Sequence, residues 1–573
     1  MLRFVVFDGE TPGAAFPLRH ATLMGRDGIG LGTDISITDE GMIECKSPEP
    51  TSYALSLQVP VVDIPPIQDS GGQAQQSSPA PTIGDVTLRT CLLPASDRPY
   101  LLSLELARHR IMTFLNKLED WGLFDLTAED PILQEFERAR KVFTHALVAE
   151  RNDHDGPLGG FTPEADRLAW QALALAVDAG EQLAMRHAAR NLEPRLNGKT
   201  YTEAVEAYIT ATGEKPPAGV PIIVQNSLGV TLSGRPIVGC TVSPVQFRET
   251  FQRCAAASSD FITLPMQWVD LEPEEGTYSF SSTDRWIEWA VRKARMPVFA
   301  GPVISFQSSA IPEWMYIWEN DYETLRELVY EHIKAIVTRY RRTVQRWTIA
   351  SGLHVNSNFR LSYEQIMDLT RLCVLLVKKL QPSAKVQVEI DQPWGEHYAC
   401  SRQSIPAVLY ADTVSQAGIP VDAYAVRLQM GVPTIGASMR DLMEISSILD
   451  RYAMLERPIF VTACGVPSRP AAEQTSELWP GYWREPASEH IQSAWLANVA
   501  SIVLSKPFVQ GLSWERLMDP PDQNKPAFGL VGADGTPKPA LERFASIRNA
   551  LRSNSPWLSP TAEPSTIEAS SNP

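Results

Sequence analysis

Residues 344–359 read VQRWTIASGLHVNSNF, an apolar segment that runs directly into a polar loop. Trp347–Ala350 is short, apolar and rich in β-branched and aromatic side chains, which is typical of a buried strand. A basic amphipathic helix is expected before it, and Ser351 and Gly352 follow it. Helix, buried strand and polar loop in this order form one unit of an α/β fold.

The same unit recurs along the chain between residues 222 and 552. The expected strands are IVGCTV, DFITLPMQW, PVFAGPVIS, QRWTIAS, KVQVEID, DAYAVRLQM, PIFVTACGV and QGLSWERL. Nearly continuous apolar strands that alternate with amphipathic helices favour a parallel sheet covered by helices. Eight such units predict an α/β fold, a (β/α)₈ TIM barrel, whose chemistry lies on the loops after the C-terminal strand ends.

Two regions of different character precede the predicted barrel. Residues 1–96 contain short strand candidates separated by Gly and Asp turns, which predict a β-sandwich-like module. Within it, residues 64–84 are rich in Pro, Ser, Gln and Gly and predict a flexible loop. Residues 97–215 show helical periodicity, and Thr162 followed by a proline predicts the start of the third helix. The β-rich module is expected either to bind sugar or to serve as a structural contact.

Composition excludes several classes of protein. The chain has 573 residues and a formal charge of −16, which argues against a nucleic-acid binder because such proteins carry a basic face. The N-terminal residues do not resemble a secretory signal, and no apolar run approaches about 18 residues. We therefore expect a cytoplasmic protein without a membrane partner, ending in a disordered tail at 553–573.

Cysteine and histidine patterns give no support to a metal site. The seven cysteines are scattered without a CxxC pair, and the nine histidines form no HxxxH or HExxH pair. No cofactor motif is found either. A homo-oligomer, or a protein partner bound through the two N-terminal regions, remains open.

Landmarks of a known family lie along the predicted barrel. The segment at 268–303 carries Trp268, Glu272, Pro273, Gly276, Tyr278, Phe280, Asp284 and Gly301. The helix at 331–347, Trp514 on the eighth strand and GLVGADGTPKPAL at 529–541 continue the series. In this order and spacing the region at about 230–552 resembles family 10 glycoside hydrolases, the endo-1,4-β-xylanases. The resemblance implies the same barrel and a carbohydrate ligand.

The resemblance also implies where two catalytic carboxyl groups should stand. Retaining glycosidases need an acid/base and a nucleophile about 5–5.5 Å apart, and the family places them after strands four and seven. Those positions hold Gly352 and Ala463 here. Neither side chain can transfer a proton or form a glycosyl ester, so the family mechanism is expected to be absent.

The family's sugar-binding positions are altered as well. After strand two they read Thr263, Leu264 and Gln267, and after strand three Pro302, Phe306 and Gln307. After strand six, a glutamine and a histidine of the family are replaced by Arg427 and Gln429. Aromatic rings can cover sugar faces, so our candidates for substrate binding are Trp268, Trp394, Arg427, Gln429 and Trp514.

Carboxylates elsewhere at the predicted barrel mouth offer a replacement. The end of strand five, VEIDQPWGEHY at 388–398, supplies Glu389, Asp391 and Glu396, and strand eight supplies Glu515. Glu396 with Glu515, or Asp391 with Glu389, could form a relocated pair. The alternative is a polar strand end with a solvated loop.

Three hypotheses therefore remain open. The first is a catalytically degenerate barrel that binds carbohydrate. The second is an active glycosidase with relocated carboxylates. The third is a structural or assembly protein whose N-terminal regions are interaction modules.

Overall fold

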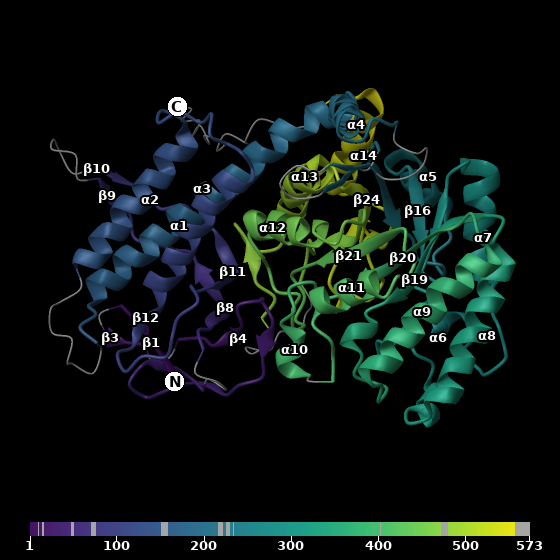
Figure 1. The fold of residues 1–573 in the computed structure, drawn as a ribbon, viewed down its shortest axis with the longest axis horizontal. Helices are drawn as coiled ribbons and strands as arrows, with labels where there is room; N and C mark the ends of the chain where they lie inside the picture. The colour runs from purple at the N-terminus through teal and green to yellow at the C-terminus, as the bar shows by residue number, and fades with distance from the viewer. Residues whose placement is uncertain are drawn as a thin grey trace, which may run out of the picture.

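The computed structural model describes residues 1–9, 11–13, 16–46, 51–69, 76–149, 159–215, 222–224, 230–232, 234–401, 403–470 and 479–555. Figure 1 shows the N-terminal strands and helices on one side and the barrel on the other. Long apolar side chains from both parts belong to one continuous buried core.

The C-terminal half is a closed parallel barrel, as the sequence predicts. Its strands pair in the order β17–β16–β15–β24–β22–β21–β20–β19, and a β17–β19 pairing closes the ring. The short β18 (Ile304–Ser305) extends the third position along β19. The eight strands are β15 (Ile237–Thr241), β16 (Phe261–Leu264), β17 (Val298–Ala300), β19 (Val344–Ser351), β20 (Lys385–Ile390), β21 (Ala423–Gln429), β22 (Ile459–Gly465) and β24 (Val509–Trp514).

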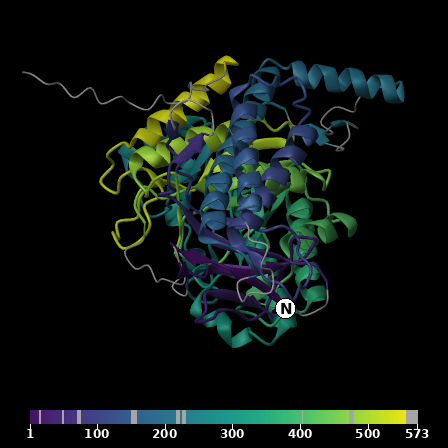
Figure 2. The ribbon, with the colours of Figure 1, turned by 90° about the vertical axis from the view of Figure 1, so that its left-hand side faces the viewer.

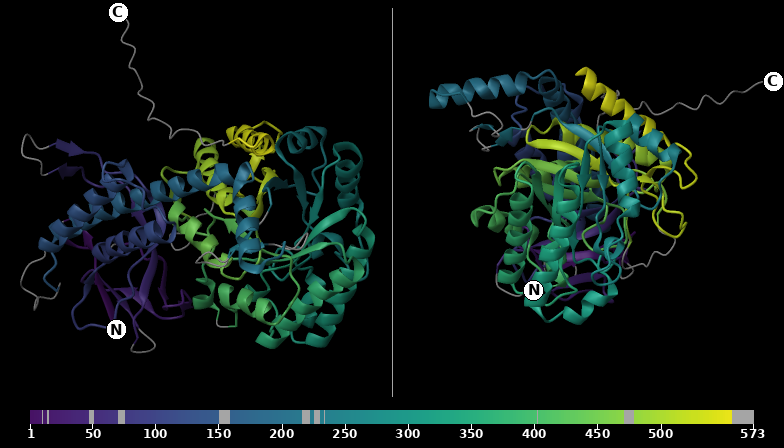
Figure 3. Two further views of the ribbon diagram at one scale, coloured as in Figure 1. Left: turned by 45° about the horizontal axis from the view of Figure 1, so that its top comes forward. Right: turned by 90° about the vertical axis from the view of Figure 1, so that its right-hand side faces the viewer.

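Helices surround this ring and give it the (β/α)₈ architecture (Figure 3). The main ones are α5 (Glu249–Ser258), α7 (Ser281–Glu288), α8 (Tyr322–Tyr340), α9 (Tyr363–Leu380), α11 (Ala407–Gln416), α12 (Leu442–Ala453), α13 (Glu489–Ser505) and α14 (Pro539–Ser553). Of the predicted tail, residues 556–573 lie outside the described residues.

Arg346, near the start of β19, lies inside the barrel, although its charge would favour a solvated position. Arg346 is 9% exposed and donates to Gln387 (3.0 Å) and Gln510 (2.7 Å). Its guanidinium also lies over the rings of Phe299 and Phe460. Strand alternation turns this side chain inward, and the two amides and two rings compensate its burial.

The N-terminal region contains one four-stranded and one five-stranded sheet, besides two-stranded ones. The first has the order β12–β1–β7–β6 and the second the order β23–β11–β8–β4–β5. Their strands are β1 (Leu2–Val5), β4 (Arg19–Met24), β5 (Gly30–Leu31), β6 (Ile35–Ile37), β7 (Met42–Cys45), β8 (Ala54–Val61), β11 (Gly84–Arg89), β12 (Tyr100–Leu101) and β23 (Tyr482–Trp483).

The position of β23 links the two halves of the chain. It belongs to the connection between β22 and α13 of the barrel, yet it pairs antiparallel with β11 of the N-terminal sheet. The barrel therefore supplies an edge strand to the N-terminal sheet.

The predicted flexible loop at 64–84 is in part an ordered hairpin. β9 (Ile67–Asp69) pairs antiparallel with β10 (Gln76–Ser78), while residues 70–75 lie outside the described residues. Backbone hydrogen bonds between β9 and β10 order these two strands although the composition of the segment is that of a linker.

Four helices follow the sheets, and α1 to α3 pack across them (Figure 2). They are α1 (Leu102–Asp120), α2 (Pro131–Val148), α3 (Pro163–Leu196) and α4 (Lys199–Thr212). The Thr162 hydroxyl accepts from the amide of Ala165 (3.1 Å) and Pro163 opens the first turn, as predicted. In Figures 2 and 3, α4 projects away from the body.

Buried polar contacts attach this helical layer to the barrel. Arg110 of α1 pairs with Asp441 at 2.7 Å, with side chains 3% and 1% exposed. Glu181 of α3 accepts from the indole of Trp483 (2.9 Å) and from the amide of Leu442 (3.0 Å). These contacts involve residues next to the start of α12, which follows strand six, or residues of β23, which follows strand seven. The N-terminal region therefore fixes both of these segments.

Candidate functional site

The barrel mouth forms a polar cleft with a volume of about 690 Å³. It lies at the C-terminal ends of β19, β20 and β21, on the face where sites of this fold form. The polar residues that line it are Gln307, Ser308, Asn356, Ser357, Asn358, Asp391, Gln392, Arg427, Gln429 and Thr434. The cleft is thus rich in amide side chains, which can both donate and accept hydrogen bonds.

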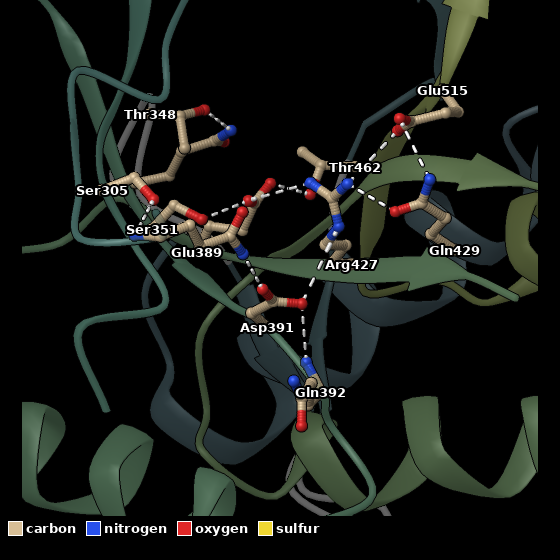
Figure 4. Close-up of polar contacts among 12 residues, drawn as sticks. Ser305, Thr348, Ser351, Glu389, Asp391, Gln392, Arg427, Gln429, Thr462 and Glu515 are labelled. Carbon is tan, nitrogen blue, oxygen red and sulfur yellow. Dashed lines mark hydrogen bonds and ion pairs between the residues drawn. The ribbon is translucent and has the colours of Figure 1, made fainter. Parts of the chain in front are cut away.

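Arg427 stands at the centre of the polar floor (Figure 4). Three carboxylates surround its guanidinium, Glu515 at 3.6 Å, Asp391 at 3.8 Å and Glu389 at 3.9 Å. All three distances exceed hydrogen-bond length. The direct bond of Arg427 goes to the side-chain oxygen of Gln429, at 2.6 Å. The carboxylates therefore share one cation, and none of them binds it closely.

The neighbours of each carboxylate hold it in place. Glu389 accepts from the hydroxyls of Ser351 (2.6 Å) and Thr462. Asp391 accepts from the Gln307 amide and from the main-chain N–H of Gln392 (2.9 Å).

Glu515 has less support than these two carboxylates. It accepts from Gln429 at 3.2 Å and lies 3.5 Å from Arg516. Burial raises the pKa of Glu515, and the guanidinium groups of Arg427 and Arg516 lower it only in part. Although burial alone would lower the pKa of Arg427, Glu515, Asp391 and Glu389 together raise it. Arg427 is therefore a permanent positive charge at the floor of the cleft.

The ends of strands four and seven present no carboxyl group to this floor. Gly352 has φ +59°, and a Cβ there would lie 3.3 Å from Cβ and 3.5 Å from Oδ2 of Asp391. Ala463 also has positive φ, +45°, and is 8% exposed. A glutamate at position 352 would adopt a strained backbone next to an existing carboxylate.

The predicted site residues divide into four groups. Arg427, Gln429 and Asp391 line the cleft. Glu389 and Glu515 are buried beneath it and contact Arg427. Of the two predicted pairs, Asp391 and Glu389 both approach Arg427, whereas Glu396 does not reach Glu515.

Trp394 and Glu396 lie elsewhere. Glu396 pairs with Arg440 at 2.6 Å and receives a hydrogen bond from Ser56 of the N-terminal sheet. The guanidinium of Arg440 lies over the Trp394 ring, 4.9 Å from its centre. Of the loop after strand five, Gln392 and Pro393 line the cleft, whereas Trp394 and Glu396 face the N-terminal region.

Trp268 and Trp514 are buried packing residues. Trp268 is 2% exposed, stacks on His332 and donates to Glu272 (2.9 Å). Trp514 is fully buried and donates to the carbonyl of Phe528 (2.8 Å). Neither ring presents a face to a ligand in this structure. Among the described lining residues the one aromatic side chain is Phe306, which is 2% exposed.

Sequence reasoning missed two walls of the cleft. One is the amide-rich turn at 356–358 after strand four, and the other is the turn at 432–437 after strand six. Both turns directly follow predicted strand ends, and this position in the sequence could have identified them as walls of the cleft. Their Asn, Ser, Pro and Gly content is common to ordinary turns, and this composition alone did not separate them from solvated loops.

The arrangement differs from that of a retaining glycosidase. A retaining reaction needs two facing carboxyl groups, one charged and one protonated, whereas here three carboxylates surround one guanidinium. Within the described ranges, no group of three His, Cys, Asp or Glu side chains is arranged to hold a metal ion. Nor does any helix in that part of the chain have the length and apolarity to cross a bilayer.

Comparison with known proteins agrees with this architecture. Residues 231–363 match the family model "Glycosyl hydrolase family 10". The barrel is xylanase-like. A curated endo-1,4-beta-xylanase of Agaricus bisporus is 22% identical over 202 residues, which are 34% of this chain and 59% of that protein. The match thus spans about three-fifths of the relative's length.

Solved xylanase structures are similar to just over half of the chain. Native xylanase 10B of Thermotoga maritima shares 15% identity with a TM-score of 0.43, covering 56% of this chain and 97% of that one. A thermostable mutant of Xyn10A from Cellvibrio japonicus shares 16% identity with a TM-score of 0.43, covering 55% and 97%. The xylanase-like barrel stands beside N-terminal regions that lie outside the family match.

Proposed function

We propose that this protein is a catalytically degenerate, xylanase-like barrel that binds a neutral carbohydrate in its cleft without cleaving it. The observation that carries the proposal is Arg427, a fixed guanidinium among Glu389, Asp391 and Glu515. A retaining reaction needs two carboxyl groups that face each other across the glycosidic bond, whereas these three are arranged around a guanidinium. Gly352 and Ala463 supply no carboxyl group at the positions after strands four and seven.

The lining supports a hydroxyl-rich ligand. Gln307, Asn358, Gln392 and Gln429 bring amide donors and acceptors to one cleft, and sugar hydroxyls match both. The buried tryptophans offer no stacking face, so hydrogen bonds carry the recognition. A neutral ligand fits because the floor already contains more carboxylates than cations.

Binding should be tested by calorimetric titration of xylo-oligosaccharides and other neutral oligosaccharides into the intact chain. Gln429→Ala should weaken binding about fivefold, the effect of losing one hydrogen bond of about 1 kcal/mol. Trp394→Phe is the matched control, because its ring lies at the N-terminal contact and should leave affinity unchanged. If the wild type binds no member of the panel, the assembly hypothesis takes precedence.

A second candidate function rests on Glu515. The raised pKa of this buried carboxyl is the property that a general acid needs. In that case the protein would be a glycosidase with relocated carboxylates, Asp391 or Glu389 acting as the charged partner. Turnover abolished by Glu515→Gln, with binding retained, would favour this function over the first.

A further inference from the structure

A second, smaller cavity lies between the N-terminal sheet and the barrel. Its volume is about 90 Å³, and it shares no lining residue with the cleft. The N-terminal region contributes Gly28 and Arg89, and the barrel contributes Glu396, Arg440, Glu444 and Arg451. Nothing in the proposed carbohydrate binding uses this cavity.

The charges in its wall do not cancel. Arg440 and Glu396 are 4% and 2% exposed and neutralise each other in a 2.6 Å pair. Arg89, Arg451 and Glu444 line the same space, and none of them forms an ion pair with another described residue. Two guanidinium groups thus face one carboxylate, which leaves one unbalanced positive charge.

The guanidinium groups keep donors available. Arg89 uses Nε to donate to His109 (3.1 Å), and Arg451 donates through Nη2 to the carbonyl of Asp27. Because a guanidinium has five N–H donors, each retains several for a ligand. The buried hydroxyl of Ser447, also in the wall, has no hydrogen-bond partner in the described part of the chain.

The potential in this region is positive. Burial by itself would raise the pKa of Glu444, yet Arg89, Arg110, Arg440 and Lys117 hold it below the ordinary value. Glu444 is therefore charged at neutral pH without fully balancing the guanidinium groups. The same surroundings favour a further anion.

A glycine makes room for one of the arginines. Gly28 has φ +73°, and a Cβ at this position would lie 2.7 Å from Nη1 of Arg451. This backbone conformation favours glycine, and a side chain here would displace the flexible end of Arg451. The backbone thus lets the guanidinium lie against the turn at the cavity edge.

We propose that this cavity binds a small oxyanion, a phosphate or a short carboxylate, between Arg89 and Arg451. Guanidinium groups match the planar pairs of oxygens that both anions present. A volume of about 90 Å³ equals roughly three water molecules, so a sugar or nucleotide is too large. Water could fill the space but could not balance the charge.

The test is calorimetric titration and thermal unfolding of the full chain with sodium phosphate or sodium glycolate, at constant ionic strength set with chloride. An anion that binds the folded state raises Tm in a concentration-dependent way. Arg89→Gln and Arg451→Gln should each weaken binding about tenfold or more, as expected for a lost charged hydrogen bond. Arg26→Gln, at an exposed arginine of the same turn, should change nothing.

The two anions separate the ligand classes. A response to phosphate alone assigns a phosphate-type ligand, and a response to glycolate alone assigns a carboxylate. Gly28→Ala provides a second variant that displaces Arg451 without removing its charge, and it should also weaken binding. No heat and no Tm shift with either anion, or equal responses in the wild type and all three variants, would overturn the proposal.

Discussion

Arg110 and Arg427 lie in different parts of the chain and differ in how they contact carboxylates. Arg110, at the contact between the helical layer and the barrel, is 3% exposed and binds one carboxylate at 2.7 Å. Arg427, at the barrel mouth, is 23% exposed and stands 3.6 to 3.9 Å from three carboxylates. A close one-to-one pair fixes two segments together. A loosely shared cation does not fix its neighbours in this way, which agrees with the binding role that we propose for this floor.

The contrast between the two arginines would fail if Arg110 could be replaced without loss of stability. Arg110→Ala leaves Asp441 buried without its cation, and the expected loss in unfolding free energy is about 3–5 kcal/mol. Arg108→Ala on the same helix is the control, since Arg108 is 39% exposed in its pair with Glu105 and such pairs contribute about 0–1 kcal/mol. Urea unfolding of both variants measures the difference, and equal midpoints would contradict the structural role of Arg110.

Because Asp166 is buried in the N-terminal region, the free energy of unfolding should depend on pH. Burial raises the pKa of Asp166 to about 6 from an ordinary value of 3.8, although Ser103 donates to it at 2.6 Å. The folded state therefore holds a proton that the unfolded state releases, so stability falls as pH rises from about 4 to 6. The two-unit difference corresponds to about 3 kcal/mol. Asp166→Asn should remove this loss, and parallel stability curves for variant and wild type between pH 4 and 7 would contradict it.

The mouth should show an effect of the same sign. Burial raises the pKa of Glu515, and Arg427 and Arg516 oppose that rise. Stability should therefore fall as pH rises above the ordinary glutamate value, and Glu515→Gln should reduce that slope. Urea unfolding over the same pH range measures the slope, and an unchanged slope in Glu515→Gln would contradict the raised pKa.

The barrel could be predicted because each of its strands is a short, nearly continuous apolar run, and burial on both faces leaves that pattern in the sequence. The sequence also predicted that Arg427 and Gln429 lie at the C-terminal end of strand six. Trp394 and Glu396 could not be placed, because their surroundings come from Arg440, 44 positions beyond Glu396, and from Ser56, 340 positions before it. The pairing of β23 with the N-terminal sheet likewise depends on the tertiary structure, and no local sequence pattern predicts it.

The floor around Arg427 illustrates the same limit. Residue type indicated four candidate carboxylates, but the sharing of one guanidinium by three of them depends on the registers of β20, β21 and β24. The sequence predicted that Asp391 and Glu389 would pair with each other, and in the structure both face Arg427.

The account is tested most directly by the hydrolysis of an aryl β-xylobioside, with the released phenol followed over days against a buffer blank. The wild type should release no phenol above the blank, because the mouth offers a guanidinium where the reaction requires a facing pair of carboxyl groups. Phenol release that is sustained in the wild type and abolished by Glu515→Gln would contradict the account and establish a glycosidase with relocated acids.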